Sequence, residues 1–99
     1  MAKIVKWNKR ALQAFYDIAS YLEENFSEQA SRSFANDVFK KVEIVSRRPS
    51  AGRKAPKRKT VRYFLIGKHR RLYYRIEGKH LIISSIFDTR QHPDKDIHQ

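Results

Sequence analysis

Cysteine and long apolar runs are both missing from this chain of 99 residues. The absence of cysteine excludes disulfides and thiolate metal sites, and it fits a reducing compartment. The longest unbroken apolar run is four residues, 63–66, which is too short to cross a bilayer. Lysines also interrupt the N-terminal stretch where a secretory signal would need apolar residues. We therefore expect a cytoplasmic protein with no membrane partner, no metal and no cofactor.

Acidic residues are scarce, and one long stretch has none. The chain has 22 Lys and Arg against 10 Asp and Glu, a net charge of +12. Residues 47–75 contain twelve cations and no acid, so this stretch accounts for the whole net charge. A charge block confined to one segment creates a local field whose natural complement is nucleic acid or an acidic protein. The alternative for residues 47–59 is a solvated connector between helix and strand.

The apolar pattern predicts one α+β domain spanning residues 1–99. Residues 3–7 are typical of a strand, and three- and four-residue apolar spacing predicts helices over 8–25 and 28–47, with Asn8 and Ser27 as N-caps. Three further strands are predicted at 61–66, 70–76 and 80–87, with turns at Gly67 and Gly78. We expect an antiparallel helical hairpin packed on one side of a mostly antiparallel sheet.

Side-chain alternation assigns residues of the predicted sheet to its two faces. In the strand at 70–76, Leu72, Tyr74 and Ile76 share one face. Arg71, Tyr73 and Arg75 share the other. By the same rule Arg62 points away from the face of its strand that holds Val61, Tyr63 and Leu65. One face is therefore expected to be apolar, and the other to display cations and rings.

Three motifs in this order resemble the RelE/ParE superfamily of bacterial type II toxin–antitoxin toxins. They are the helix-ending Arg48-Pro49-x-x-Gly52, the hairpin over residues 67–76, and the closing residues 86–93. The resemblance implies a growth-inhibiting toxin that a cognate antitoxin binds and neutralises in a hetero-oligomer. RelE-like members cut mRNA on the ribosome, whereas ParE-like members inhibit DNA gyrase and are not known to be nucleases. Fold cannot choose between these two targets.

A nuclease reading nominates a set of site residues. Arg62, Arg71 and Arg90 match basic site positions of the RelE-like nucleases, and all three are expected to project from the open face of the sheet or from its edge. Arginine suits phosphate charge but is a poor general base. His69 and His92 titrate near neutrality and are candidate acid–base groups, with Asp88 and Asp94 as further candidates. The histidines are equally explained as an exposed turn residue and a tail residue. Against this reading, Phe64 stands where RelE-like enzymes have a second lysine, and no tyrosine follows Tyr74.

A binding reading requires no acid–base set. It assigns nucleic-acid or target contact to a group of cations and one ring, which are Lys54, Lys57, Arg58, Lys59, Lys68, Tyr73 and Arg75. Tyr73 either stacks on a base or only covers the sheet. A chain with this pattern and no toxicity would be a basic nucleic-acid-binding module.

The resemblance also implies how an antitoxin would bind. We expect it to lay a helix along the groove of the helical hairpin and to extend the sheet at one edge. Phe15, Leu22, Phe34 or Val38 would then be shared between the core and the interface.

Overall fold

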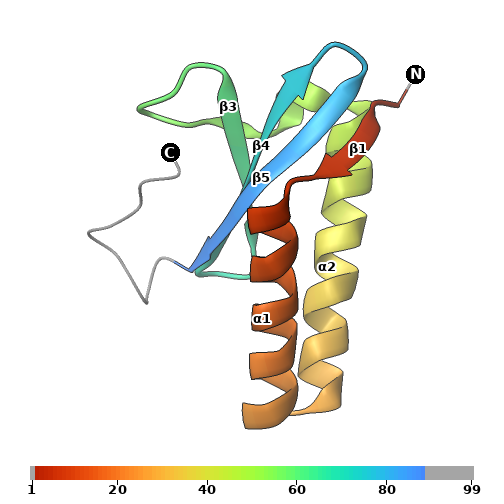
Figure 1. Cartoon of the computed structure of the whole chain (residues 1–99), viewed down its shortest axis with the longest axis vertical. Helices are drawn as coiled ribbons and strands as arrows, with labels where there is room; N and C mark the ends of the chain where they lie inside the picture. The colour runs from red at the N-terminus through yellow and green to blue at the C-terminus, as the bar shows by residue number, and fades with distance from the viewer. Residues whose placement is uncertain (1, 89–99) are drawn as a thin grey trace.

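Residues 2–88 are described by a computed structural model, in which two helices and five strands form one layer each (Figure 1). The N-terminal half holds β1 and the two helices, and the C-terminal half holds the remaining strands. The elements are β1 (Ile4–Trp7), α1 (Lys9–Asn25), α2 (Glu28–Arg47), the short 3₁₀ helix η1 (Pro49–Ala51), β2 (Arg53–Lys54), β3 (Val61–Ile66), β4 (Arg70–Glu77) and β5 (His80–Asp88).

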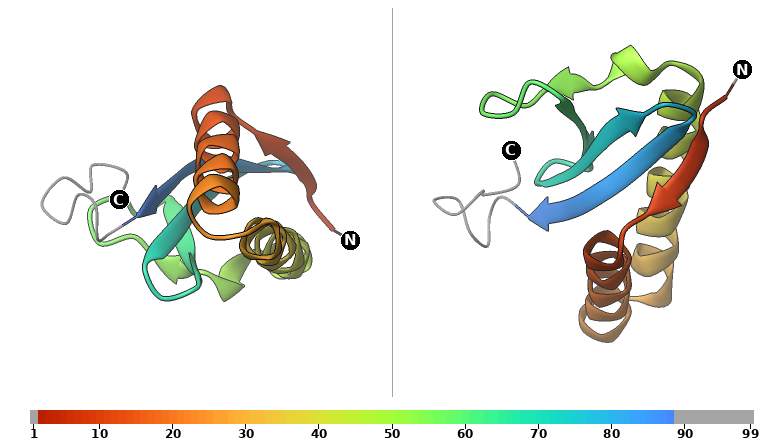
Figure 2. Two further views of the ribbon diagram at one scale, coloured as in Figure 1. Left: turned by 90° about the horizontal axis from the view of Figure 1, so that it is seen from below. Right: turned by 45° about the horizontal axis from the view of Figure 1, so that its top comes forward.

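The five strands form one sheet in the order β1-β5-β4-β3-β2. β1 runs parallel to β5, and the other three pairings are antiparallel. Figure 2 shows β1 beside β5 at one edge of the sheet, while the chain that follows η1 reaches the opposite edge. The predicted α+β fold is confirmed. Sequence analysis missed η1 and β2, because it assigned the whole of residues 47–59 to a loop.

The helices begin at the predicted caps. The Asn8 side chain accepts a hydrogen bond from the Ala11 amide at 2.9 Å, and Ser27 accepts one from the Ala30 amide at the same distance. The hairpin packs its apolar stripe against one face of the sheet, and both helices extend past the end of the sheet (Figure 1). We call this the helix-side face. Its core includes Phe15, Phe34, Val38, Leu72 and Ile83 among others.

The opposite face, which we call the open face, carries a second and smaller apolar cluster. Ala55, Val61, Tyr73 and Phe87 are buried there, and Tyr63 packs against them half-buried. The open face is therefore more than a row of cations. This cluster attaches the chain around Ala55 to the central strands.

A bulge in β5 explains how its side chains reach both clusters. Tyr74 pairs with Ile83, whereas its neighbour Tyr73 pairs with Ser85, so one residue of β5 is extra at this point. An extra residue reverses the alternation of the side chains that follow. As a result Ile83 and Ile86 both face the helices, although they are an odd number of positions (three) apart in sequence.

Candidate functional site

The Tyr74 hydroxyl holds the chain segment that follows α2. Tyr74 is fully buried on the helix-side face; its hydroxyl donates to the Pro49 carbonyl at 2.6 Å and accepts from the Gly52 amide at 3.0 Å. Burial raises the pKa of the Tyr74 phenol, while the Gly52 hydrogen bond and the charge of Arg62 oppose that rise. The phenol is therefore neutral at physiological pH and able to make both hydrogen bonds.

Arg62 makes a second connection to the same segment. It lies on the helix-side face, opposite Tyr74 in the β3–β4 register. Its Nη1 donates to the Gly52 carbonyl at 2.7 Å and to the Ser50 carbonyl at 3.3 Å. We refer to Tyr74 and Arg62, with the backbone of residues 49–52 that they bind, as the loop clamp. Sequence analysis nominated Arg62 for phosphate chemistry, but the structure places its guanidinium on backbone carbonyls.

The loop clamp leads directly into a short basic segment, residues 53–59, which we call the cationic arm. Its first two residues form β2, with Arg53 opposite Tyr63 and Lys54 opposite Arg62. The buried residue Ala55 donates its amide to the Val61 carbonyl at 2.9 Å, and the Val61 amide donates to the Arg58 carbonyl at 3.2 Å. The arm is thus hydrogen-bonded to β3 at several points along its length.

The five cations of the arm are exposed. Arg53, Lys54, Lys57, Arg58 and Lys59 all have exposed side chains, and none forms an ion pair with an acid within residues 2–88. Lys68, also nominated for target contact, is exposed in the β3–β4 turn. The arm therefore exposes five positive charges on a backbone that is hydrogen-bonded to β3.

The remaining nominated cations of β4 lie on the open face and contact neighbours there. The Arg71 guanidinium carbon lies 4.7 Å from the centre of the Tyr63 ring, and its Nη1 is 3.4 Å from the Tyr73 hydroxyl. Arg75 pairs with Glu77 at 2.5 Å. Tyr73 itself has no exposed surface, so its ring covers the sheet and offers no platform to a base in this conformation.

Among the nominated nuclease residues that the structure describes, Arg62 and Arg71 were expected on one face of the sheet and are not brought together. Arg62 faces the helices, whereas Arg71 lies on the open face, so the sheet separates their guanidinium groups. His69 is exposed in the β3–β4 turn, and Asp88 is buried at the end of β5. Phe64 packs against the helix-side core. Arg90, His92 and Asp94 lie outside the described residues.

Sequence analysis overlooked Arg70, which lies at the start of β4 under the helical hairpin. Its guanidinium carbon is 5.6 Å from the centre of the Phe34 ring, and its Nε is 3.7 Å from the Asp88 carboxylate. Its side chain is only 16% exposed. Alternation from Leu72 would have placed Arg70 on the helix-side face. Arg70 was overlooked because it lies within the acid-free stretch 47–75 and was counted there as one of its twelve cations.

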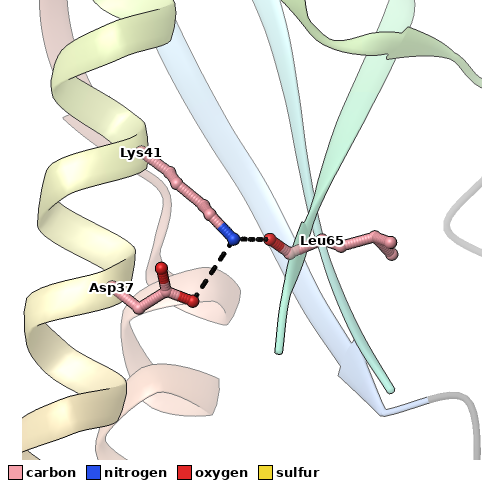
Figure 3. Close-up of polar contacts among 3 residues, drawn as sticks. All are labelled: Asp37, Lys41 and Leu65. Carbon is pink, nitrogen blue, oxygen red and sulfur yellow. Dashed lines mark hydrogen bonds and ion pairs between the residues drawn. The ribbon is translucent and has the colours of Figure 1, made fainter. Parts of the chain in front are cut away.

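A hollow of about 270 Å³ opens between α2 and the outer edge of β3. It is lined by Ile44, Val45, Phe64 and Leu65 together with Lys41 and residues of η1, β2 and β3. β2 covers β3 only as far as Tyr63. Beyond that point the Lys41 ammonium donates to the Leu65 carbonyl at 2.7 Å and lies 3.4 Å from the Asp37 carboxylate (Figure 3). The Lys41 side chain thus donates a hydrogen bond to a carbonyl at the sheet edge that the backbone amide of an added strand could bind.

The apolar side chains exposed on the outer surface of the helical hairpin are not the four that were expected to contact an antitoxin. Phe15, Phe34 and Val38 are core residues, and Leu22 is half-buried. The exposed apolar side chains along the two helices are Leu12, Tyr16, Tyr21, Phe39 and Ile44, with Phe26 between the helices. Phe39 and Tyr16 both contact the ring of Phe15, so these exposed rings continue the core outward.

The model of one protein family matches residues 5–93, and that family is the ParE toxin of the type II toxin–antitoxin system parDE. The match extends over most of the chain. This chain belongs to the ParE toxin family. It is the toxin component of a type II toxin–antitoxin system. A search of curated proteins finds no significant match to this ParE-family sequence.

Solved structures of toxin–antitoxin proteins share the fold of this ParE-family toxin. A chain of the chromosomal ParDE system from P. aeruginosa superposes with a TM-score of 0.73 at 17% identity, covering 88% of this chain and 96% of that one. The YoeB dimer from Staphylococcus aureus gives a TM-score of 0.62 at 14% identity, covering 86% and 94%. The RelBE2 complex from Mycobacterium tuberculosis gives 0.54 at 15% identity, covering 89% and 99%.

The described part of this ParE-family chain has neither a membrane-spanning helix nor a cluster of metal-binding side chains. Neither α1, α2 nor any other helix within residues 2–88 is both long and apolar enough to cross a membrane. Across the same residues, no three His, Cys, Asp or Glu side chains are grouped so that they could hold a metal ion.

Proposed function

We propose that this ParE-family toxin arrests growth by binding and inhibiting DNA gyrase, and that it does not cleave mRNA. The observation that carries the proposal is the separation of Arg62 and Arg71 onto opposite faces of the sheet. Two guanidinium groups on opposite faces cannot stabilise one phosphorane. The family match supports the same target, because ParE-like toxins act on gyrase.

The chemistry of RNA cleavage explains why this separation supports the proposal. Cleavage needs a base at the 2′-hydroxyl, a cation at the phosphate and an acid at the leaving oxygen, all within hydrogen-bonding reach of one nucleotide. The Nη1 atom of Arg62 already donates hydrogen bonds to two backbone carbonyls, and Phe64 has no titratable group. Inhibition by binding requires only a folded surface complementary to the enzyme.

The antitoxin of this toxin is proposed to cover two neighbouring surfaces. A strand added beside β3 would continue the sheet beyond Tyr63, where the edge is not covered by β2, and would displace Lys41 from the Leu65 carbonyl. An apolar side chain of that strand would enter the hollow beside Phe64. A helix of the antitoxin would lie over the exposed side chains of the hairpin, including Tyr16 and Phe39.

The target is tested with purified toxin and with induced cells. Gyrase supercoiling of relaxed plasmid is followed at increasing toxin concentration, with relaxation by topoisomerase I as the control for effects on the DNA alone. We expect supercoiling to stop at toxin concentrations that leave topoisomerase I active. In parallel, mRNA 5′ ends are mapped after induction. Codon-phased cuts that disappear in Arg71→Ala, with supercoiling unaffected, would refute the proposal.

A further inference from the structure

We infer that the cationic arm, residues 53–59, binds the phosphodiester backbone of nucleic acid independently of sequence, and that the loop clamp holds it in the binding position. This goes beyond the proposed function, since gyrase is a protein and the arm would give the toxin its own hold on a nucleic acid. Arg62 and Tyr74 then act as positioning residues and do not contact phosphate.

The cations of the arm have no acidic partner among residues 2–88. Five of its seven residues are Arg or Lys, and none is paired with an acid among the described residues. Glu77, at the end of β4, already pairs with Arg75. Exposed like charges on a short segment repel one another, so an anionic partner that releases counterions gains at every contact.

The clamp removes the freedom that such a segment would otherwise have. Tyr74 and Arg62 together make four hydrogen bonds to the backbone of residues 49, 50 and 52. Ala55 is then anchored in the open-face cluster and bonded to Val61. A binding segment that is already ordered loses less conformational entropy on association. The clamp should therefore affect how tightly the arm binds, but not how many phosphates it neutralises.

The composition of the arm favours nucleic acid over an acidic protein. Protein interfaces depend on apolar and aromatic anchors at their centre. Within residues 53–59 the apolar side chains are those of Ala55, which is buried in the protein, and Pro56. Binding to a phosphate backbone needs charge and hydrogen-bond donors and no such anchor.

The charge contribution is tested by fluorescence anisotropy of purified toxin with a 20-bp duplex DNA, a single-stranded RNA and polyglutamate. Five phosphate contacts give a slope of log K against log salt of about −4.5 on duplex DNA. The Lys57→Gln/Lys59→Gln variant should reduce the slope to about −2.7. The matched control, Lys6→Gln/Lys9→Gln, removes the same charge from exposed positions outside the arm and should leave the slope unchanged.

The clamp is tested by Tyr74→Phe. The control is Tyr63→Phe, which removes a phenol hydroxyl that forms no hydrogen bond to the arm within residues 2–88. We expect Tyr74→Phe to weaken duplex binding about three- to tenfold, with an unchanged salt slope, because the arm is looser but carries the same charge. Arg62→Met should weaken binding further, and Arg62→Lys should recover part of the loss. Thermal unfolding of each variant confirms that the protein is folded at the temperature of the binding assay.

Each outcome decides the inference. Equal slopes for the arm and control lysine variants, or binding to polyglutamate as tight as to both nucleic acids at one salt concentration, would overturn it. Binding to DNA or RNA with the expected slopes supports it, and the tighter of the two names the nucleic acid. The assay contains no gyrase, so failed gyrase inhibition would leave a positive result standing, and the reverse also holds.

Discussion

Replacing Gly52 by alanine tests whether the loop clamp is as tight as the structure indicates. A Cβ atom at this position would lie 2.3 Å from the Tyr74 hydroxyl oxygen and 2.7 and 2.9 Å from two carbons of the same ring. The ring is fully buried and cannot swing aside. The backbone of Gly52 has φ −72° and ψ 159°, which any residue adopts, so steric conflict with Tyr74 is the sole penalty.

The magnitude follows from the contacts that must give way. Overpacking a rigid site costs about 1–3 kcal/mol. Lifting the loop to relieve the clash would also weaken the hydrogen bonds of Tyr74 to Gly52 and Pro49, each contributing about 0.5–1.5 kcal/mol. We expect Gly52→Ala to lower the free energy of unfolding by about 2–4 kcal/mol, or Tm by roughly 10–20 °C for a domain of this size.

The assay is urea and thermal unfolding followed by circular dichroism, with Ser50→Ala as the control. Ser50 is exposed in the same loop, and its replacement should change stability by less than about 0.5 kcal/mol. A double-mutant cycle with Tyr74→Leu isolates the conflict, because the cost of Gly52→Ala should fall once the ring is gone. Equal stability of Gly52→Ala and the parent protein would refute the tight contact.

Three further predictions concern stability. Because burial raises the pKa of Tyr74, the folded protein keeps the phenol proton at a pH where the unfolded chain has lost it. The free energy of unfolding should therefore be highest below about pH 10 and should fall as the pH rises further. Urea midpoints measured across that range should fall less steeply for Tyr74→Phe. Asn8→Ala should cost about 1 kcal/mol through loss of the N-cap, whereas exposed Lys9→Ala should cost little; equal costs would contradict the cap. Lys41→Met should lower the free energy of unfolding by about 1 kcal/mol, because it removes a charged hydrogen bond to the Leu65 carbonyl that solvent partly screens. The control is Lys40→Met, at an exposed position of the same helix. Equal stability of the two variants would count against the Lys41 contact.

Local sequence rules predicted the helices and the main strands. The caps Asn8 and Ser27 and the apolar spacing placed both helices within a residue of their observed bounds. The strand at 61–66 was predicted with its observed limits. β2 and the β5 bulge escaped prediction for a physical reason. β2 is only two residues long, both of them cations, and it pairs with β3 directly after the backbone that the clamp holds. A bulge depends on pairing across strands, which periodicity within one strand does not encode.

The site was less predictable, because its contacts join residues distant in sequence. Alternation correctly separated Arg62 from Val61 and Tyr63, but the expectation that Arg62 and Arg71 project from the same open face was wrong. Arg62 pairs with Tyr74 on the helix-side face, whereas Arg71 lies over Tyr63 on the open face. What alternation cannot supply is the partner: the carbonyls that Arg62 binds lie ten and twelve residues earlier, on a segment that has no regular pattern. The resemblance implied a phosphate role for Arg62, which stays a prediction, and in the structure this side chain binds the backbone of the clamp.

The clamp gives a physical meaning to the motif Arg48-Pro49-x-x-Gly52. Pro49 begins η1 after α2 has ended, and its carbonyl accepts the Tyr74 hydroxyl. Gly52 leaves the space that the Tyr74 ring fills. The motif therefore sets where the chain leaves the helical hairpin and how the cationic arm reaches the sheet edge. None of these contacts contributes a reactive group, so the motif stabilises the loop and does not distinguish a gyrase inhibitor from a nuclease.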